Sequence, residues 1–200
     1  MHGYVQTLVE ISLHAGFCHG KDPCRLHKNT FYYIVTQAYD EPIEYIVSMN
    51  WQPHVTVAAV IEREHKFLLV QERVDEHTVF NQPAGHWEQG ETLIEAVRRE
   101  TLEETGWEFY PDALVGVYCW KHPHKDETYL RFTLCGQCSE KRISDELDAG
   151  ILQACWCSAD SILSLPEHKL RSTMVTHSLQ DYLDGKRYGL DLIRTIHQHW

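Results

Sequence analysis

Apolar residues gather in short, β-prone runs from position 51 onward, and turn residues separate each run from the next. Such a pattern predicts strands bounded by turns. The predicted strands are residues 54–61, 66–73, 113–120, 130–138 and 153–157. The third and fourth runs flank the charged turn HPHKDE and are expected to pair with each other. The stretch NQPAGHWEQGE, which contains Gly and Pro, predicts a loop after the second run.

The strongest helix signal begins at Thr92. Thr92 and Glu95 have the spacing of a capping box, and Gly106 has the position of a glycine that ends a helix. No Pro or Gly lies between these signals, and good helix formers are frequent there. The sequence therefore predicts a helix that starts after Thr92 and stops at Gly106.

Two further helices are predicted near the C-terminal end. Ser158 opens a brief helix that Pro166 limits, and residues 171–183 form an amphipathic helix that Gly185 follows. Strands mixed with helices on either side indicate an α/β (α+β) sandwich.

The apolar side of the first helix also carries carboxylates. At about 100° per residue, one arc of that helix holds Leu93, Ala96, Val97, Glu100, Glu103 and Glu104. Like charges three or four residues apart destabilise a helix by about 0.2–0.5 kcal/mol per pair, and facing the body of the domain adds to the cost. A divalent cation would offset this repulsion, and a donor set of hard oxygens suits Mg²⁺ or Mn²⁺. The alternative is a solvated acidic helix face, which the arc geometry contradicts.

Composition limits the classes of partner. The 200 residues allow one domain of ordinary size with an appendage, and a hydrophobic content of 43% is normal for a globular core. A net charge of −11 argues against nucleic acid as a partner but not against a small phosphorylated molecule. No apolar run is long enough to span a membrane, and the N-terminus makes a poor signal peptide, so a cytoplasmic location is expected.

The seven cysteines have two interpretations. Their positions are Cys18, Cys24, Cys119, Cys135, Cys138, Cys155 and Cys157. The last four form one C-x₂-C pair and one C-x-C pair, which makes a zinc site conceivable. Both pairs lie in predicted strands, where residues three apart do not share a face, so buried free thiols are the simpler interpretation.

A domain boundary is expected near Met49. Residues 1–48 are interpreted as an N-terminal extension of unknown role, for which a mis-assigned translation start is one explanation. Candidate metal ligands in the extension are His14, Cys18, His19, Cys24 and His27. Their spacing matches no strong zinc pattern, and the alternative is a weakly ordered extension.

A family resemblance rests on the segment from Gly85 to Trp107. This segment resembles the Nudix box: it has Gly85, five residues, Glu91, seven residues and then RETLEETGW. Thr101 alone departs from the box, at a position that is usually aliphatic. The resemblance implies a Nudix hydrolase domain over residues 49–200, with a Nudix-type α/β/α sandwich and a mixed β-sheet.

A closer resemblance is to the NudJ-type phosphatases. It rests on the stretches PHVTVAAV, KFLLV, NQPAGHWEQGETLIEA, YLRFTL and GKRYGLDLI. The resemblance implies Mg²⁺-dependent release of orthophosphate from nucleoside tri- and diphosphates and from thiamine or hydroxymethylpyrimidine pyrophosphate. One alternative is a Nudix pyrophosphohydrolase of nucleoside diphosphate-linked substrates such as ADP-ribose. Another is a non-catalytic Nudix-fold ligand sensor, which the retention of every box carboxylate disfavours. The oligomeric state is not predicted.

The expected metal ligands are Glu100, Glu103 and Glu104, and the resemblance adds the backbone carbonyl of Gly85. Arg99 is expected to pair with a box carboxylate and fix its rotamer, or else to form a surface pair with Glu103. Either Glu103 or Glu104 is a candidate general base, although the base of Nudix enzymes sometimes lies outside the box. Glu91 is expected to accept a hydrogen bond from Arg99 or from a ligand water.

Substrate contacts are less specific in the sequence. Arg131 lies among apolar neighbours, so it faces either a phosphate in a pocket or solvent from a strand. His86 is a candidate substrate contact or a hydrogen-bond donor behind the metal ligands. Phosphate-clamping candidates in the charged turn, each more simply solvated, are Lys121, His122, His124 and Lys125. Ring-stacking candidates, each more simply a core residue, are Trp51, Phe80, Trp87 and Trp120.

Overall fold

The structure is a computed structural model that describes residues 33–35, 43–45 and 51–196. The chain divides into two compact units, Met1–Gln52 and Pro53–Trp200. The candidate metal ligands of the N-terminal extension lie outside the described residues.

A short antiparallel pair is described in the first unit. Strand β1 (Tyr33–Val35) pairs with β2 (Ile43–Tyr45), and Tyr33 lies opposite Tyr45. The other described strands and all described helices belong to the second unit.

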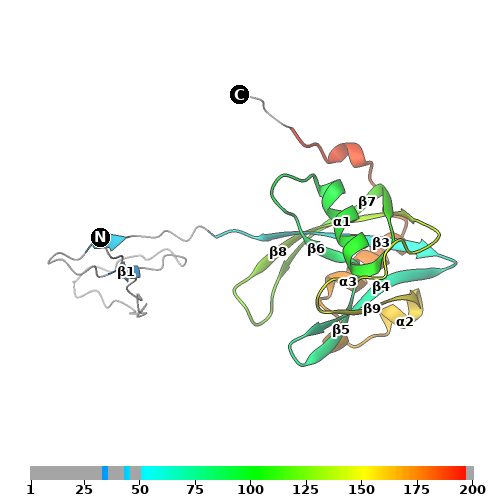
Figure 1. The fold of residues 1–200 in the computed structure, drawn as a ribbon, viewed down its shortest axis with the longest axis horizontal. Helices are drawn as coiled ribbons and strands as arrows, with labels where there is room; N and C mark the ends of the chain where they lie inside the picture. The colour runs from blue at the N-terminus through cyan, green and yellow to red at the C-terminus, as the bar shows by residue number, and fades with distance from the viewer. Residues whose placement is uncertain (1–32, 36–42, 46–50, 197–200) are drawn as a thin grey trace, which may run out of the picture. The chain divides into compact units, whose positions relative to one another are not determined.

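A mixed seven-stranded sheet is the centre of the second unit (Figure 1). Its strands are β3 (His54–Arg63), β4 (Lys66–Val74), β5 (His77–Asn81), β6 (Ala84–His86), β7 (Phe109–Lys121), β8 (Thr128–Cys138) and β9 (Ile151–Ser158). The order is β5-β4-β3-β8-β7, with β6 paired to β3 and β9 paired to β4. The β3–β8 pair is parallel, and the other pairs are antiparallel. The predicted pairing of the two strands around the turn HPHKDE is therefore confirmed.

The helices of the second unit are α1 (Leu93–Thr105), α2 (Ala159–Leu163) and α3 (Met174–Leu183), with 3₁₀ turns η1 (Glu167–Lys169) and η2 (Leu190–Leu192). The predicted start of α1 is confirmed, because the Thr92 and Glu95 side chains each accept a hydrogen bond from the other's backbone N–H. Gly106 ends α1 in the left-handed conformation, as predicted. Among the described residues, no helix has the length and apolar character needed to cross a membrane.

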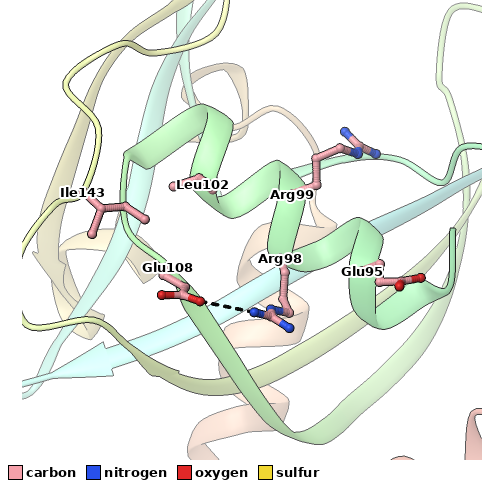
Figure 2. Close-up of a pocket in the computed structure, with 6 residues that line it drawn as sticks. All are labelled: Glu95, Arg98, Arg99, Leu102, Glu108 and Ile143. Atoms are coloured by element: carbon pink, nitrogen blue, oxygen red, sulfur yellow. Dashed lines mark hydrogen bonds and ion pairs between the residues drawn. The ribbon is translucent and has the colours of Figure 1, made fainter.

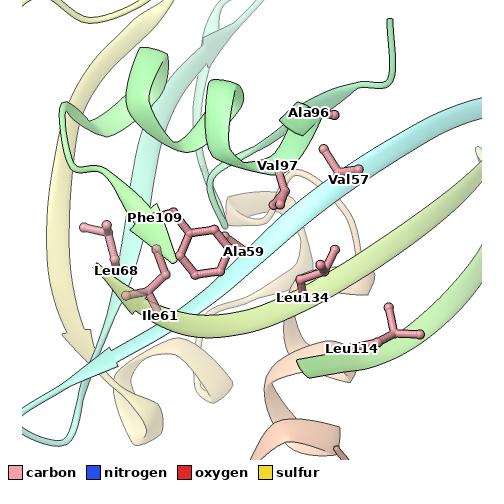
Figure 3. Close-up of a cluster of buried hydrophobic side chains, with 9 residues drawn as sticks. All are labelled: Val57, Ala59, Ile61, Leu68, Ala96, Val97, Phe109, Leu114 and Leu134. Carbon is pink, nitrogen blue, oxygen red and sulfur yellow. The ribbon is translucent and has the colours of Figure 1, made fainter. Parts of the chain in front are cut away.

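Two apolar clusters lie on opposite faces of the sheet and make the fold an α/β/α sandwich. The first lies beneath α1 (Figure 3) and consists of Val57, Ala59, Ile61, Leu68, Ala96, Val97, Phe109, Leu114 and Leu134. The second includes Val60 of β3 and Val175 and Leu179 of α3. The sheet divides its side chains between the clusters because successive residues of a strand point to opposite faces. Each buried Val, Leu or Ile contributes about 1.5–3 kcal/mol.

Several elements differ from the sequence-based expectation. The stretch expected to be a loop contains β6, and β5 was not predicted. The predicted helix over residues 171–183 begins only at Met174. Strand β7 starts at Phe109, and Pro111 lies within it beside a register shift. The proline is tolerated because β7 is an edge strand, where a missing N–H donor costs little.

The described cysteines are free thiols. Cys135 on β8 is buried, and Cys155 and Cys157 share one face of β9 with their Sγ atoms 3.7 Å apart. Burial raises the pKa of the Cys135 thiol to about 11 and that of Cys155 to about 12. These thiols are therefore protonated at neutral pH.

Asp181 joins α3 to β7 through its carboxylate. Oδ1 accepts a hydrogen bond from Lys186 Nζ at 2.6 Å, and Oδ2 accepts one from Tyr118 Oη at 2.9 Å. The bond from Lys186, together with that from Tyr118, lowers the pKa of the Asp181 carboxyl. Because the folded-state pKa is depressed, this stabilisation is complete above the unfolded-state pKa of about 3.9 and is lost as the pH falls through the folded-state value.

We therefore expect Asp181→Asn to lower the Tm at neutral pH by about 2–4 °C, which corresponds to about 1 kcal/mol for a domain of this size. The difference from the unmodified protein should shrink at pH below about 4. Thermal unfolding followed by circular dichroism over a pH series measures both effects. The matched control is Asp126→Asn, since Asp126 lies 3.6 Å from Lys121 with its side chain 87% exposed, and should change the Tm little. A difference for Asp181→Asn that is independent of pH would contradict the expectation.

Candidate active site

The candidate site begins where β6 approaches α1. Gly85 of β6 pairs with Val57 of β3, which fixes its position in the sheet. A Cβ atom at Gly85 would lie 2.0 Å from the carboxyl carbon of Glu100. Ala84 donates its backbone N–H to Glu104 Oε2 at 2.8 Å. Glycine is therefore required at position 85 for the carboxylates of α1 to lie against the backbone of β6.

Arg99 connects the carboxylates around this contact. It makes a bidentate pair with Glu91, with Nε 3.0 Å from Oε2 and Nη2 2.8 Å from Oε1. Its Nη1 donates to Glu100 Oε1 at 2.8 Å and to Glu103 Oε2 at 3.0 Å, and Nη2 donates to the His86 carbonyl at 3.0 Å. The sequence offered three separate pairings for Arg99: with a box carboxylate, with Glu103 and with Glu91. The structure has all three pairings at once.

Burial sets the electrostatics of the carboxylates. Desolvation raises the pKa of Glu100, and it raises that of Glu104 to about 8, with repulsion from Glu72 adding to the shift. The hydrogen bond from Arg99 instead lowers the pKa of Glu91. Glu100 and Glu104 are each 8% exposed, so neither belongs to a solvated helix face. A cation beside them would stabilise their charged forms.

The donor set fits a hard divalent cation in its chemistry. Glu100 and Glu104 present carboxylate oxygens from the buried side of α1, and Glu103 adds a carboxylate whose side chain is 44% exposed. Oxygen donors of this kind suit Mg²⁺ or Mn²⁺. As the side chains stand, no group of three or more His, Cys, Asp or Glu residues in the described part of the chain converges on one point to hold a metal. Arg99 takes hydrogen-bonding positions on Glu100 and Glu103, so metal binding would require those two side chains to reorient.

Thr101, the one departure from the Nudix box pattern, is buried within α1. Its hydroxyl donates to the carbonyl of Val97 at 2.7 Å, so the polar atom is satisfied by the helix itself. The substitution therefore leaves the carboxylate positions of α1 undisturbed.

A pocket of about 140 Å³ lies beside β6. Its lining residues are Thr56, Glu72, Asn81, Ala84, Gly85, His86, Trp120, His122, Tyr129, Arg131, Arg171, Ser172 and Met174. Arg131 of β8 is only 5% exposed, which excludes the solvent-facing alternative. Because Ala84 and Gly85 also contact the carboxylates of α1, the pocket and the acidic cluster share β6 as a common wall.

Glu72 and Arg171 are pocket residues that the sequence did not identify. Arg171 Nε lies 3.5 Å from Glu72 Oε1, and burial raises the pKa of Glu72. The sequence gave Arg171 the role of a helix start, but it precedes α3 and is held by a backbone hydrogen bond to Phe80. Glu72 lies near the polar end of a predicted strand, where a carboxylate has no distinctive signal.

The candidate substrate contacts of the charged turn separate into two groups. His122 lines the pocket, as do the ring-stacking candidate Trp120 and Tyr129, which the sequence did not identify. Lys121 is exposed and forms an ion pair with Asp126. The exposed residues His124 and Lys125 donate backbone N–H groups to His122 Nδ1. His86 also lines the pocket, where burial lowers its pKa.

The other aromatic candidates have structural contacts. Trp87 donates its Nε1–H to the Glu91 carbonyl at 2.7 Å, and Phe80 packs against the cluster on the α3 side. Trp51 is 57% exposed and belongs to the first unit.

A second, larger pocket of about 310 Å³ lies on the outer side of α1 (Figure 2). Its lining residues are Glu95, Arg98, Arg99, Leu102, Glu108 and Ile143. Arg98 Nη2 pairs with Glu108 Oε1 at 3.2 Å across this pocket, and Arg99 points away from the pair in Figure 2. Since the buried carboxylates lie on the other side of α1, the smaller pocket beside β6 is the better candidate for chemistry.

Comparisons with known proteins agree with this geometry. The NUDIX domain family matches residues 52–177. Phosphatase NudJ of Escherichia coli is 39% identical over 143 residues, which cover 72% of this chain and 92% of that protein. The solved structure of a NUDIX hydrolase from Nitrosomonas europaea is 44% identical with a TM-score of 0.69, and the match covers 72% of this chain and 98% of that chain. A MutT NUDIX hydrolase from Burkholderia pseudomallei has the same fold, at 22% identity and a TM-score of 0.54 over 66% of this chain and 98% of its own.

Members of the Nudix family typically depend on a divalent metal and act on small phosphorylated substrates. The buried carboxylates of α1 and the arginines beside β6 suit both requirements. The domain match and the similarity to phosphatase NudJ show that this chain belongs to the Nudix family and is a Nudix hydrolase related to that phosphatase.

Proposed function

We propose that this protein is a Mg²⁺-dependent phosphatase, active with Mg²⁺ or Mn²⁺, that hydrolyses phosphoanhydrides and releases orthophosphate. Its proposed substrates are nucleoside tri- and diphosphates and the pyrophosphates of thiamine and hydroxymethylpyrimidine. The observation that carries the proposal is the shared wall β6, which has buried carboxylates on one side and a pocket with two arginines on the other. We place this activity in residues 49–200 and in the cytoplasm.

The metal would be held by Glu100, Glu103 and Glu104, with the carbonyl of Gly85 completing the protein donors. When bound, Mg²⁺ supplies charge neutralisation at the phosphate oxygens and lowers the pKa of water. The resting ion pairs of Arg99 keep Glu100 and Glu103 close to β6, which limits the distance they must move. Glu91, bound bidentately to Arg99, positions the arginine.

Glu103 is the better-placed of the two candidate bases. Its side chain is 44% exposed and therefore accessible to water, whereas Glu104 is buried and accepts the backbone N–H of Ala84. A carboxylate among other carboxylates can accept a proton near neutral pH. In this assignment Glu103 would both bind the metal and orient the attacking water, and Glu104 would be a ligand alone.

Similarity to phosphatase NudJ supports a phosphatase over a hydrolase of ADP-ribose. That relative is 39% identical over most of the domain. The similar structure described as an ADP-ribose pyrophosphatase, from Streptococcus suis, is 18% identical and therefore indicates the fold alone. The pocket beside β6 offers arginines for phosphate groups and Trp120 and Tyr129 as aromatic surfaces.

Product analysis tests the substrate class. We expect the purified protein with Mg²⁺ to release orthophosphate from ADP, ATP and thiamine pyrophosphate, because Arg131 and Arg171 beside the carboxylates suit a terminal phosphate. We expect ADP-ribose to remain intact. The measurement is ³¹P NMR of the reaction mixtures, with chelated metal as the control. AMP and ribose 5-phosphate from ADP-ribose would move the protein to the alternative class.

The metal site is tested by Glu103→Gln. We expect this substitution to lower kcat by about 100-fold or more, because loss of a metal-binding carboxylate exceeds the 10–100-fold cost of losing its supporting groups. We also expect weaker binding of Mn²⁺, measured by electron paramagnetic resonance without substrate. The fold should persist, since a glutamine oxygen can still accept the hydrogen bond from Arg99.

The matched control is Glu108→Gln. Glu108 pairs with Arg98 on the outer side of α1, away from the proposed metal. Its substitution should leave both kcat and the affinity for Mn²⁺ unchanged. If Glu103→Gln kept full activity and full Mn²⁺ affinity, Glu103 would be excluded as a ligand and as the base.

A further inference from the structure

Buried polar atoms without hydrogen-bond partners collect in the pocket beside β6. Among the described residues that line this pocket, four side-chain atoms have no hydrogen-bond partner: Thr56 Oγ1, Glu72 Oε1, Arg131 Nε and Ser172 Oγ. Of these, Glu72 Oε1 lies 3.5 Å from Arg171 Nε in an ion pair. Thr56 is 4% exposed, Arg131 5% and Ser172 7%. A buried polar group without a partner is costly, and most such groups in folded proteins are satisfied. The two hydroxyls and Arg131 Nε are donors without an acceptor at one small pocket, which indicates a site that is complete only with a polar ligand.

Strand pairing places these groups together. Thr56 of β3 lies opposite Arg131 of the parallel strand β8 and opposite His86 of β6. Laterally paired residues project to the same face of a sheet, which brings the three side chains into one row. Ser172, from the segment before α3, closes the pocket over this row.

The pocket also has an excess of positive charge. Within residues 51–196, no carboxylate forms an ion pair with Arg131, whose hydrogen bond to Asn81 Oδ1 is long at 3.5 Å. Burial lowers the pKa of Arg131 to about 10, so the side chain remains a cation at neutral pH. Glu72 is the acidic residue among those that line the pocket, and its ion pair is with Arg171. The unpartnered donors therefore favour an anion.

We propose that Thr56, Arg131, Arg171 and Ser172 bind the terminal phosphate of the substrate. This deepens the proposed function, on which it rests, by naming the residues that recognise the terminal, unsubstituted phosphate of those substrates. A terminal phosphate has three non-bridging oxygens and up to two negative charges, which match two hydroxyl donors and two guanidinium groups. A diphosphate esterified at both ends has one acceptor oxygen fewer on each phosphorus and less charge.

The position of the pocket agrees with release of that phosphate. Ala84 and Gly85 line the pocket and also contact Glu104 and Glu100. In the proposed binding mode, the anhydride bond of a phosphate held in the pocket extends past β6 toward the carboxylates. Hydrolysis forms a bond from the water oxygen to the terminal phosphorus and breaks the bond from that phosphorus to the bridging oxygen. The bridging oxygen leaves with the rest of the substrate, the proton of the water passes to the proposed base Glu103, and orthophosphate remains in the pocket.

Removal of the hydroxyls tests the site without harming the fold. Since Thr56 Oγ1 and Ser172 Oγ have no partner in the protein, Thr56→Val and Ser172→Ala should leave the Tm unchanged or slightly higher. We expect each variant to bind inorganic phosphate about tenfold more weakly, because a hydrogen bond to a charged ligand is lost. The measurement is isothermal titration calorimetry of the full chain with inorganic phosphate in the absence of metal.

Thr133→Val is the matched control. Thr133 Oγ1 is also buried and without a partner, but Thr133 does not line the pocket. This variant should keep the phosphate affinity of the unmodified protein. Unchanged affinity in both Thr56→Val and Ser172→Ala, with the Tm retained, would overturn the proposal, as would an equal loss in Thr133→Val.

Steady-state kinetics separates this proposal from the proposed function. With ADP as substrate, the two variants should show a raised KM, while Thr133→Val should not. Metal-dependent hydrolysis with unchanged phosphate affinity in both variants would refute the phosphate site and leave the phosphatase assignment standing. Weakened phosphate binding in the variants of a protein that hydrolyses no phosphoanhydride would refute the phosphatase assignment and support the anion site.

Discussion

The approach of β6 to α1 is the contact on which the rest of the site depends. It is possible because Gly85 has no side chain where the carboxyl group of Glu100 lies. The sheet fixes β6 through its pairing with β3, and the capping box at Thr92 fixes where α1 begins. Any side chain at position 85 would displace the carboxyl group of Glu100 from its position against β6. The position of the Glu100 carboxylate in the candidate site therefore depends on this one contact.

Arg99 balances the charge that this contact creates. Three carboxylates around one guanidinium leave a negative excess, and burial makes negative charge costly at Glu100 and at a fourth carboxylate, Glu104. An arginine suits this role because its planar fork donates in several directions and stays charged. A divalent cation would compete with Arg99 for Glu100 and Glu103. The carboxylate oxygens of Glu100 and Glu103 thus have two possible positive partners, a divalent cation and Arg99. Arg99 is the partner that the protein itself supplies.

The sequence was most informative where the structural signal is local. The capping box, Gly106 and the acidic arc predicted α1 and its buried face, because each depends on residues within a few turns of one another. Strands β5 and β6 were missed because they are short and exist through pairing with β4 and β3. The pocket residues Glu72, Arg171 and Ser172 were missed for the same reason, since only the tertiary fold brings them to Arg131. Burial of Arg131 likewise depends on neighbours that β8 alone does not specify.

Each side of β6 lacks interaction partners, and the partners missing on the two sides have opposite charges. On one side buried carboxylates lack sufficient positive charge, and on the other side Arg131 and two hydroxyls lack acceptors. Neither defect stabilises the fold, and each costs free energy in the isolated protein. A phosphorylated substrate with its cation would correct both at once, since phosphate oxygens accept from the pocket and the metal neutralises the carboxylates. Ligands that bind only the folded state raise its stability, and because each ligand would favour binding of the other, phosphate and metal together should stabilise the domain by more than the sum of their separate effects. That coupling would follow from the shared wall, because the proposed binding mode puts the scissile bond between the two incomplete halves.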